Sequence, residues 1–264
     1  MSSDTPSLRL LLPSPEALPA DPAERRLVEL CTPPAGRHVR ANMVASVDGG
    51  AWGEDGRSGS INDAADWRIF RVLRALADVV LVGAGTARAE AYTALERPRG
   101  LATLRDRPLE LALVTRSGRV PDTLLAGGRP PWVVTGSAGA ATAAAAVGRE
   151  RVVEADDGGA VDLAAGTAGL AERGMAHVLC EGGPHLLAAM LAADLVDELC
   201  LTTTPQLVGP GPGRVVAGLP DVAAPAGPVG PAEHVPTAGR RPARLGHLLA
   251  APSGTLVARW ELRP

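Results

Sequence analysis

The chain has 264 residues, 46% of them hydrophobic, which suffices for the core of one large domain or two small ones and excludes a disordered protein. Its formal net charge is −3 and its basic residues, all arginine, are scattered, so a broad nucleic-acid-binding face is not expected. The 3 cysteines lack C-x-x-C spacing and no H-E-x-x-H motif occurs, so neither a disulfide frame nor a bound metal is expected.

Residues 1–36 are rich in proline and are predicted to form an extension in front of a single domain over residues 37–264. Within this extension, DPAERRLVEL predicts a short helix with Asp21 as its cap and Pro22 at the first helical position. The amino terminus has no basic segment before an apolar run, and no apolar run approaches the roughly 20 residues of a membrane helix. We therefore expect a cytoplasmic protein without a membrane partner.

From Arg37 onward, strand and helix patterns alternate. HVRANMVAS predicts a strand, and NDAADWRIFRVLRALA predicts a helix capped by Asn62. On that helix Arg68 and Arg71 are expected to point away from the apolar face. That face is predicted to comprise Trp67, Phe70, Leu73, Leu76 and Ala77.

Short β-branched runs typical of strands buried on both faces follow at DVVLVG, ELALVT, PWVVTG and RVVEA, with helices at AATAAAAV and DLAAGTAGLAERG. HVLCEGG then predicts a strand, PHLLAAMLAADL a helix and DELCLTTTPQLV another strand. Residues 210–254 predict an irregular connection with one short strand, and TLVARWEL predicts an edge or antiparallel strand. This alternation predicts an α/β fold with a mostly parallel central sheet flanked by helices.

Three glycine-rich segments follow predicted strands: residues 45–60, 83–90 and 181–187. Ligands of α/β sheets collect at the carboxyl ends of strands, so these segments are candidate sites. GAGTARAE begins like a dinucleotide fingerprint, but Arg88 replaces the third glycine and no acidic residue ends the next strand. By itself it predicts a tight turn. Arg116, after the next strand, suits a 2′-phosphate, although a solvated turn arginine is equally consistent with the sequence.

The other polar candidates each allow two interpretations. Gly182 and Gly183 precede a helix whose positive end can face a phosphate, or they form a simple helix-entry turn. Glu181 follows a buried strand and needs a partner, for which a ligand is a candidate. Asp48 lies in an Asp-Gly turn pair, which is more often structural than catalytic. Arg74 either extends its charge to solvent or holds an anionic substrate group.

Five segments in this order resemble the pyrimidine reductase family of riboflavin biosynthesis: NMVASVDGG, GRSGSI, LRALADVVLVGAGTARAE, LCEGGPHLLAAML and LVDELCLTTTPQLVG. The resemblance runs from about Val39 to Gly209. It implies a dihydrofolate-reductase-like fold with antiparallel C-terminal strands, a homodimer and NADPH as cofactor. It also implies the reaction: the ribosylamino group of a 5-phosphoribosyl-aminopyrimidine, deaminated or not, is reduced to a ribitylamino group by hydride transfer to C1′.

With the resemblance, the segment GAGTARAE is expected to contact the dinucleotide through Thr86 and Glu90. The residues expected at the substrate are Asn42, Ser58, Arg74, Arg97 and Glu181. Those expected at the cofactor are Ala45, Ser60, Gly83, Gly85, Thr86, Glu90, Arg116, Ser117, Gly182, Gly183, Pro184, His185, Leu186 and Leu187. Asp48 and Glu181 are the acidic candidates for proton transfer, and a water molecule is an equal candidate.

Two alternatives stay open. One is dihydrofolate reduction, since the fold hosts several NADPH-dependent reductions. A folate enzyme normally places a carboxylate inside the first helix, whereas Asp63 and Asp66 are predicted at its start, which favours the pyrimidine substrate. The other alternative is a catalytically silent NADP-binding protein.

Overall fold

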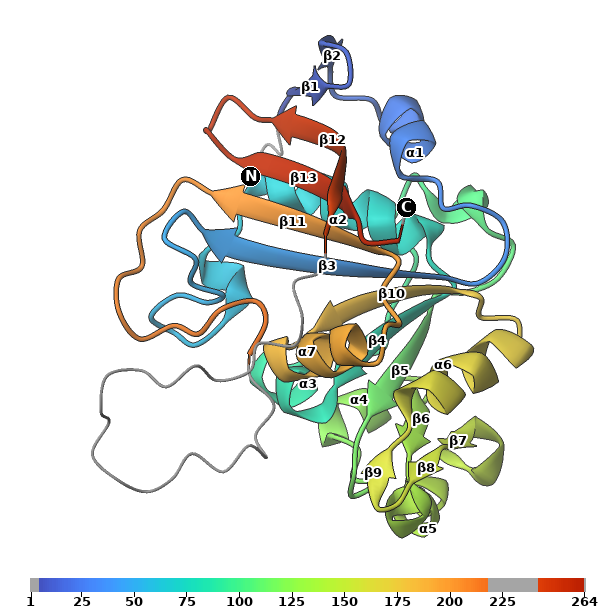
Figure 1. Ribbon diagram of the computed structural model, residues 1–264. Coiled ribbons are helices and arrows are strands. Elements are labelled where there is room, and N and C mark those ends of the chain that lie inside the picture. The colour runs from blue at the N-terminus through green and yellow to red at the C-terminus, as the bar shows by residue number, and fades with distance from the viewer. Residues whose placement is uncertain (1–4, 218–241, 264) are drawn as a thin grey trace.

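The computed structural model describes residues 5–217 and 242–263, and an 11-stranded sheet runs through all of this part (Figure 1). The order across the sheet is β2-β1-β12-β13-β11-β3-β10-β4-β5-β6-β7. In chain order these strands are β1 (Leu8–Leu12), β2 (Glu16–Leu18), β3 (His38–Ser46), β4 (Val79–Gly83), β5 (Glu110–Val114), β6 (Trp132–Thr135), β7 (Val152–Glu154), β10 (His177–Gly182), β11 (Glu198–Thr204), β12 (Arg244–Ala250) and β13 (Leu256–Glu261). A separate two-stranded sheet joins β8 (Asp156–Asp157) and β9 (Ala160–Val161).

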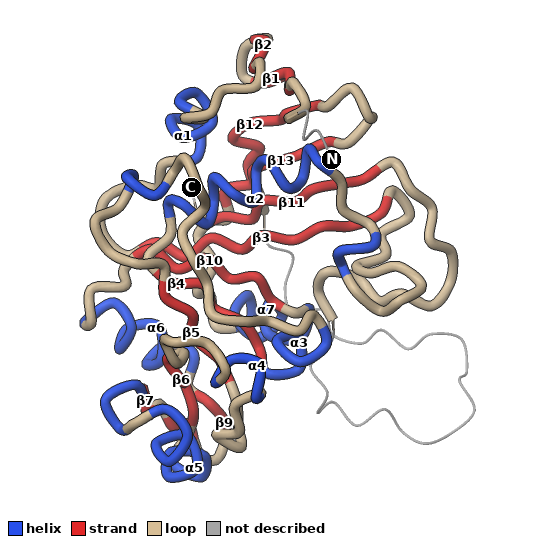
Figure 2. The backbone as a smooth tube through the Cα atoms, turned by 180° about the vertical axis from the view of Figure 1, so that it is seen from behind, coloured by secondary structure: helices blue, strands red, loops and turns tan. Residues whose placement is uncertain are grey.

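The helices lie on both faces of this sheet (Figures 1 and 2). They are α1 (Arg25–Cys31), α2 (Ala64–Leu76), α3 (Ala84–Ala89), α4 (Asp122–Leu125), α5 (Ser137–Val147), α6 (Leu163–Glu172) and α7 (Pro184–Ala192), with 3₁₀ turns η1 (Ser58–Ser60), η2 (Ala102–Leu104) and η3 (Arg149–Arg151). Alternate side chains of β4 point to opposite faces of the sheet. Val80 and Val82 pack in the core beneath α2, while Val79 and Leu81 pack in the core beneath α6 and α7. The unbroken apolar runs of the sequence follow from burial on both faces.

The strands from β11 to β7 are parallel to one another, while β13, β12, β1 and β2 continue the sheet antiparallel. The predicted α/β fold with a mostly parallel sheet and antiparallel C-terminal strands is confirmed. TLVARWEL is antiparallel but not an edge strand, because β13 pairs with both β11 and β12. The sequence predicted an irregular connection with one short strand over residues 210–254. That strand is β12, and residues 218–241 lie outside the described part.

The proline-rich amino-terminal segment is built into the sheet. β1 pairs with β12, and Leu8 and Leu10 are buried in the same core as α2. The first helix begins at Arg25 and not at Asp21, whose carboxylate instead accepts the backbone N–H groups of Ala23 and Arg25. Whether residues 1–36 form a unit separate from the remaining domain stays a prediction.

Helix α2 is capped by Asp63, not by Asn62 as predicted. The Asp63 carboxylate accepts the N–H groups of Ala65 at 2.9 Å and of Asp66 at 3.0 Å. The buried face also differs from the predicted one: Trp67 is 53% exposed, whereas Arg68 is only 3% exposed. A charged side chain is tolerated at this depth only because its charge and its donors are matched.

Arg68 is matched by the amino-terminal segment. Its guanidinium group donates to both carboxylate oxygens of Glu24, at 2.6 to 3.1 Å, and to the carbonyl oxygens of Pro6, Leu18 and Pro19. In addition to the pairing of β1 with β12, this α2 side chain thus holds the amino-terminal segment against the domain.

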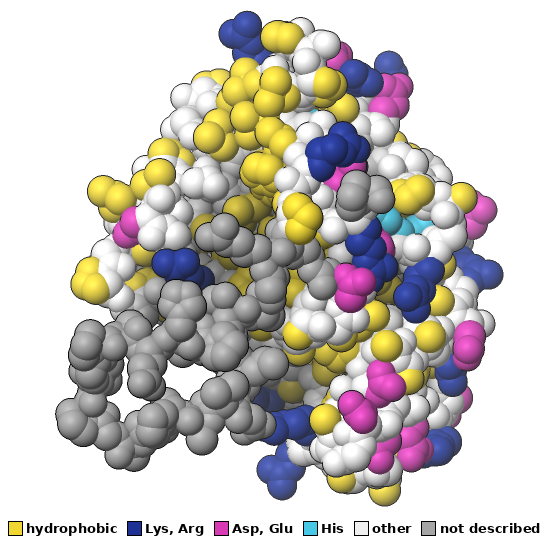
Figure 3. Space-filling view, viewed as in Figure 1, with side chains coloured by type: hydrophobic (Ala, Val, Ile, Leu, Met, Phe, Trp, Pro, Cys, Tyr) yellow, Lys and Arg dark blue, Asp and Glu magenta, His cyan; other side chains and the backbone are white. Residues whose placement is uncertain are grey.

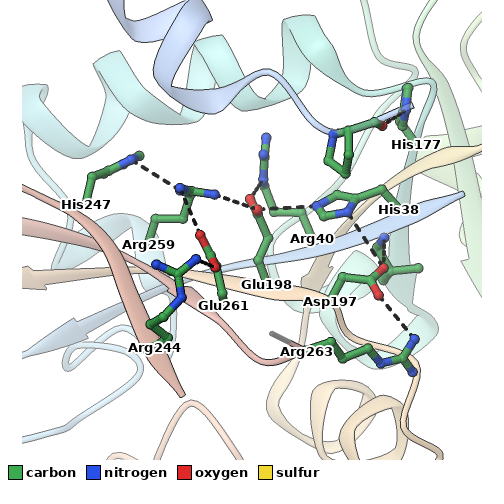
Figure 4. Close-up of polar contacts among 12 residues, drawn as sticks. His38, Arg40, His177, Asp197, Glu198, Arg244, His247, Arg259, Glu261 and Arg263 are labelled. Carbon is green, nitrogen blue, oxygen red and sulfur yellow. Dashed lines mark hydrogen bonds and ion pairs between the residues drawn. The ribbon is translucent and has the colours of Figure 1, made fainter. Parts of the chain in front are cut away.

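A second set of buried charges joins the parallel and antiparallel parts of the sheet (Figure 4). Glu198 of β11 contacts Arg40 and His38 of β3 and Arg259 of β13. Burial alone would raise the pKa of Glu198, but hydrogen bonding from His38 and the charge of Arg40 outweigh it and lower this pKa to about 2. His247 of β12, next to Arg259, is kept neutral, because burial and that arginine lower its pKa to about 4.

Replacing Arg68 by alanine should lower the free energy of unfolding by about 3 to 5 kcal/mol, because it leaves the buried Glu24 carboxylate without a countercharge. Urea denaturation measures this loss. The matched control is Arg71→Ala on the same helix, where the guanidinium group donates only to the exposed carbonyl of Arg99, and a loss of about 1 kcal/mol or less is expected. Equal losses in the two variants would contradict the anchoring role of Arg68.

Candidate functional site

A cavity of about 340 Å³ opens at the carboxyl end of β3, against helix α2. Its walls come from β3, from α2, from the loop before α2, from residues 90–95 and from Glu181 at the end of β10. This volume suits a small organic ligand. The position agrees with the general location of ligand sites in α/β sheets.

Four of the five residues expected at the substrate line this cavity. They are Asn42, Ser58, Arg74 and Glu181. The fifth, Arg97, does not line it, because its guanidinium group donates to the carbonyl oxygens of Ala75 at 2.7 Å and Ala77 at 3.0 Å. Arg97 therefore satisfies free carbonyls at the end of α2, which leaves the expected phosphate contact without structural support.

Glu181 finds its partner within the protein. Arg74 donates from Nε and Nη2 to the two Glu181 carboxylate oxygens, each at 2.7 Å, and the Tyr92 hydroxyl donates to Oε2 at 2.5 Å. Burial opposes the charge on Arg74, but the Glu181 carboxylate outweighs it and raises the pKa of Arg74. Burial, helped by the Glu181 charge, holds the pKa of Tyr92 well above its usual value, so Tyr92 stays a neutral donor.

Aromatic side chains gather at this cavity although aromatics make up only 2% of the chain. The single phenylalanine, Phe70, and the single tyrosine, Tyr92, both line it, together with Trp67. The Trp67 and Phe70 rings stack with centroids 5.2 Å apart, and Cζ of Arg74 lies 4.1 Å from the Phe70 centroid. These rings give the cavity a flat, apolar wall that suits an aromatic ligand.

Asp66 is a cavity residue to which sequence reasoning gave no role. It was expected with Asp63 at the start of the helix, and it does lie in the first turn of α2, where Asp63 is the cap. Asp66 lines the cavity and is 6% exposed. Burial raises its pKa to about 6, and no ion pair joins it to an arginine anywhere in residues 5–217 and 242–263. The spacing of Asp66, Phe70 and Arg74, four residues apart on one helix, was the signal that could have revealed it.

Asp48 does not line the cavity. Its carboxylate is exposed and accepts the Ser46 hydroxyl and the N–H groups of Val208 and Gly209. The hydrogen bond from Ser46 is the main cause of a lowered pKa at Asp48. The residue therefore holds two loops together as an ionised acceptor, and it is not arranged to give up a proton to a ligand in the cavity.

Among the residues expected at the cofactor, only Glu90 lines the cavity, where its carboxylate accepts the N–H of Ser58 at 2.8 Å. GAGTARAE is not a tight turn, since α3 begins directly at Ala84 after β4. Thr86 on that helix accepts the N–H of Gly183 at 2.8 Å. A β-carbon at Gly183 would lie 2.4 Å from the Thr86 hydroxyl, so only glycine permits this approach.

The remaining predicted cofactor residues lie along the same edge of the sheet, outside the cavity lining. Gly83 ends β4 and Gly85 is open to solvent on α3. Arg116 and Ser117 are exposed after β5, and no described side chain or carbonyl pairs with the Arg116 guanidinium group. Leu187 is fully buried in the core, so its side chain is unavailable to a ligand. The others are Ala45 (buried at the end of β3), Ser60 (bonded to Asp55), Gly182 (at the end of β10) and Pro184, His185 and Leu186 (in the first turn of α7).

Neither a metal centre nor a membrane span is found in residues 5–217 and 242–263. No three His, Cys, Asp or Glu side chains in this part gather as metal ligands. None of its helices has the length and apolarity needed to cross a bilayer.

The family model described as "RibD C-terminal domain" matches residues 37–226. No curated protein sequence matches the chain. Among solved structures, a pyrimidine reductase-like protein of Corynebacterium diphtheriae is 22% identical with a TM-score of 0.68, the match covering 86% of this chain and 92% of that one. RibD of Acinetobacter baumannii is 19% identical with a TM-score of 0.61, covering 87% and 59%. The riboflavin biosynthesis reductase Rib7 of Saccharomyces cerevisiae is 16% identical with a TM-score of 0.57, covering 92% and 100%. At these identities the structural likeness shows the fold, and the chain spans little more than half of the RibD protein.

Proposed function

The chain belongs to the RibD C-terminal domain family, and from this premise we propose that it is an NADPH-dependent reductase of riboflavin biosynthesis. Its substrate would be 5-amino-6-(5-phosphoribosylamino)uracil or the non-deaminated analogue, whose ribosylamino group becomes ribitylamino. The observation that carries this proposal is the meeting of Asn42, Ser58, Arg74 and Glu181 at one cavity, beside the strand ends expected to hold the cofactor.

The residues along the carboxyl edge of β4, β5 and β10 fit a dinucleotide. Nothing lies within 4 Å of where a Gly85 β-carbon would stand, so a ligand can approach that backbone closely. Arg116 offers an exposed, unpaired guanidinium group for a 2′-phosphate. At the start of α7 no side chain caps the helix, so the N–H groups of His185 and Leu186 are free for an anion. When bound, NADPH supplies the hydride.

The chain's own residues orient the substrate. Trp67 and Phe70 provide the flat wall for the pyrimidine ring. Arg74, fixed by Glu181, places a positive charge at the cavity for the anionic sugar phosphate. Glu181 already accepts three hydrogen bonds and Asp48 lies outside the cavity lining, so we infer that a bound water molecule delivers the proton.

Purified protein should oxidise NADPH when given the phosphoribosylamino-pyrimidine, followed by the loss of nicotinamide absorbance. The Arg74→Ala variant should lose at least about 100-fold in kcat/KM, because a charge-assisted contact and its pairing with Glu181 disappear together. Arg71→Ala, on the same helix but outside the cavity lining, should turn over like the wild type. NADPH that binds without oxidation on any pyrimidine or dihydrofolate would favour a silent NADP-binding protein instead.

A second candidate is dihydrofolate reduction. The specific observation in its favour is Asp66, a buried carboxyl on the first helix of the reductase segment that lines the cavity. The sequence counted against this candidate because Asp63 and Asp66 were expected at the start of the helix and not inside it, and Asp66 does lie in the first turn of α2. Oxidation of NADPH with dihydrofolate alone would select this candidate over the pyrimidine substrate.

Arg116→Ala should raise KM for NADPH about 10- to 100-fold and leave KM for NADH unchanged, because the exposed guanidinium group serves only the 2′-phosphate. Steady-state titrations with the two cofactors measure the difference. Arg119→Ala, an exposed arginine in the same loop, is the control and should change neither value. If Arg116→Ala raised both KM values equally, or neither, the assignment would be wrong.

We also infer a homodimer in the cytoplasm. The face of the antiparallel strands turned away from α2 carries half-exposed apolar side chains, which Figure 3 shows gathered over β12 and β13. Three rows of paired residues across β1, β12, β13 and β11 make up this face: Leu12, Leu248, Ala258 and Leu201; Leu245, Trp260 and Leu199; and Ala250 and Leu256. Such a continuous apolar face suits a second copy of the chain packed about a two-fold axis. The three cysteines are free and buried, as in proteins of a reducing compartment.

Sedimentation should therefore give twice the mass of one chain. Leu256→Asp places a charge on this face at a side chain that is 39% exposed, so it should yield monomers while leaving the fold intact. Far-UV circular dichroism checks the fold. A wild-type chain that sediments as a monomer at micromolar concentration would exclude this interface.

A further inference from the structure

The turn between β12 and β13, residues 251–255, is bound to the start of helix α2. Thr255 in this turn is fully buried, and its hydroxyl donates to Oδ2 of Asp63 at 2.6 Å. The hydroxyl of Ser253 donates to the same oxygen at 2.9 Å. The two donors lie 192 and 190 residues away from Asp63 in the sequence. The C-terminal hairpin therefore holds the residue that caps α2.

Asp63 carries this contact into the helix. Its other carboxylate oxygen, Oδ1, accepts the N–H groups of Ala65 at 2.9 Å and of Asp66 at 3.0 Å, two donors for which a helix start has no internal acceptor. One carboxylate thus joins the turn to the helix. Burial opposes its charge, but the hydrogen bonds from Thr255, Ser253 and the two N–H groups outweigh burial and lower the pKa of Asp63. The carboxylate stays ionised, and hydrogen bonds to an ionised group are the strong ones.

The helix turn that Asp63 caps forms part of the cavity wall. Asn62, Asp66 and Trp67 line the cavity, and all three lie next to Asp63 or in the turn that follows it. The ends of helices fray when their free N–H groups lose an acceptor. The pair of Arg74 and Glu181 cannot prevent this, because Arg74 lies in the last turn of α2. The first turn therefore needs an anchor of its own.

We propose that Thr255 and Ser253 are positioning residues for the substrate: acting through Asp63, they fix the first turn of α2 and so set the affinity of the cavity for the pyrimidine. This inference rests on the proposed function of the cavity as the substrate site. Neither hydroxyl residue lines the cavity, so both act without touching the substrate. The C-terminal hairpin thereby takes part in substrate binding as well as in completing the sheet.

Loss of this contact should affect the substrate and not the cofactor. The proposed dinucleotide site lies along the carboxyl edge of β4, β5 and β10, where α3 and α7 begin. The hydrogen bond between Thr86 and Gly183 joins these elements there. The side chains of Ser253 and Thr255 donate to Asp63, on the other side of the cavity residues of α2. A general weakening of the fold would instead affect both ligands, so the two KM values separate the explanations.

Thr255→Val removes the hydroxyl, keeps the shape of the side chain and tests the proposal directly. KM for the phosphoribosylamino-pyrimidine should rise about 10-fold, which is the usual effect of losing a hydrogen bond to a charged group. KM for NADPH should stay unchanged. Thr255→Ser keeps the hydroxyl and should behave like the wild type. Ser253→Ala removes the second donor at an exposed residue, so it should raise the same KM without endangering the fold.

Thr167→Val on α6 is the matched control. Thr167 is also buried, and its hydroxyl donates to the carbonyl oxygen of Leu163 at 2.9 Å. The variant therefore loses a buried threonine hydroxyl in a helix that packs on the opposite face of the sheet from α2. It should leave both KM values unchanged.

Amide hydrogen exchange followed by NMR reports the step between the turn and the substrate, without turnover. The amides of Ala65 and Asp66 should exchange faster in Thr255→Val, and at the wild-type rate in Thr255→Ser and Thr167→Val. Unchanged exchange at these two amides, an unchanged KM for the pyrimidine, or an equal rise in both KM values would overturn the proposal. A wild type that never oxidises NADPH with the pyrimidine fails the proposed function, and the exchange of the two amides still decides whether the turn fixes α2.

Discussion

The buried pair of Arg74 and Glu181 is the interaction on which the site depends. It joins helix α2 to the end of β10 at the carboxyl edge of the sheet, with Tyr92 as a third member. Two charges withdrawn from water are stable only when each satisfies the other in good geometry. The pair therefore fixes the distance between helix and strand, and that distance defines one wall of the cavity.

The architecture separates two tasks. The cavity against α2 offers aromatic rings, a fixed arginine and a buried carboxyl, which are groups that recognise one small ring and its anionic substituent. The edge beyond it, along β4, β5 and β10, offers backbone and an exposed arginine, which suit an extended nucleotide. Glu90 lies between the cavity and this edge of the sheet. It lines the cavity, and its carboxylate accepts a hydrogen bond from the backbone N–H of Ser58. In the proposed reaction, this boundary is where the substrate and the cofactor would meet.

The sequence predicts those features that follow from local apolar patterns or from motif order, but not those that depend on partners distant in the chain. The strands β3 and β4 and the sheet type follow from apolar runs, because burial on both faces excludes polar residues there. The cavity residues Asn42, Ser58 and Arg74 were found through motif order, not through periodicity. By contrast, the partners of Arg97 could not be predicted, because backbone carbonyls leave no mark in a sequence. The burial of Arg68 depends on Glu24, a partner distant in the chain, and Asp66 is buried in the wall of a cavity, so a helical pattern alone could not predict the burial of either residue.

The most direct test of the central claim, that the cavity against α2 is where ring and cofactor meet, is a crystal structure of the protein with NADP⁺ and the pyrimidine substrate. The account predicts the pyrimidine ring against Trp67 and Phe70, and the nicotinamide at the cavity mouth beside Glu90. The adenosine phosphate should lie near Arg116. A substrate ring found outside this cavity, or a cofactor bound away from the carboxyl edge of β4 and β10, would contradict the account.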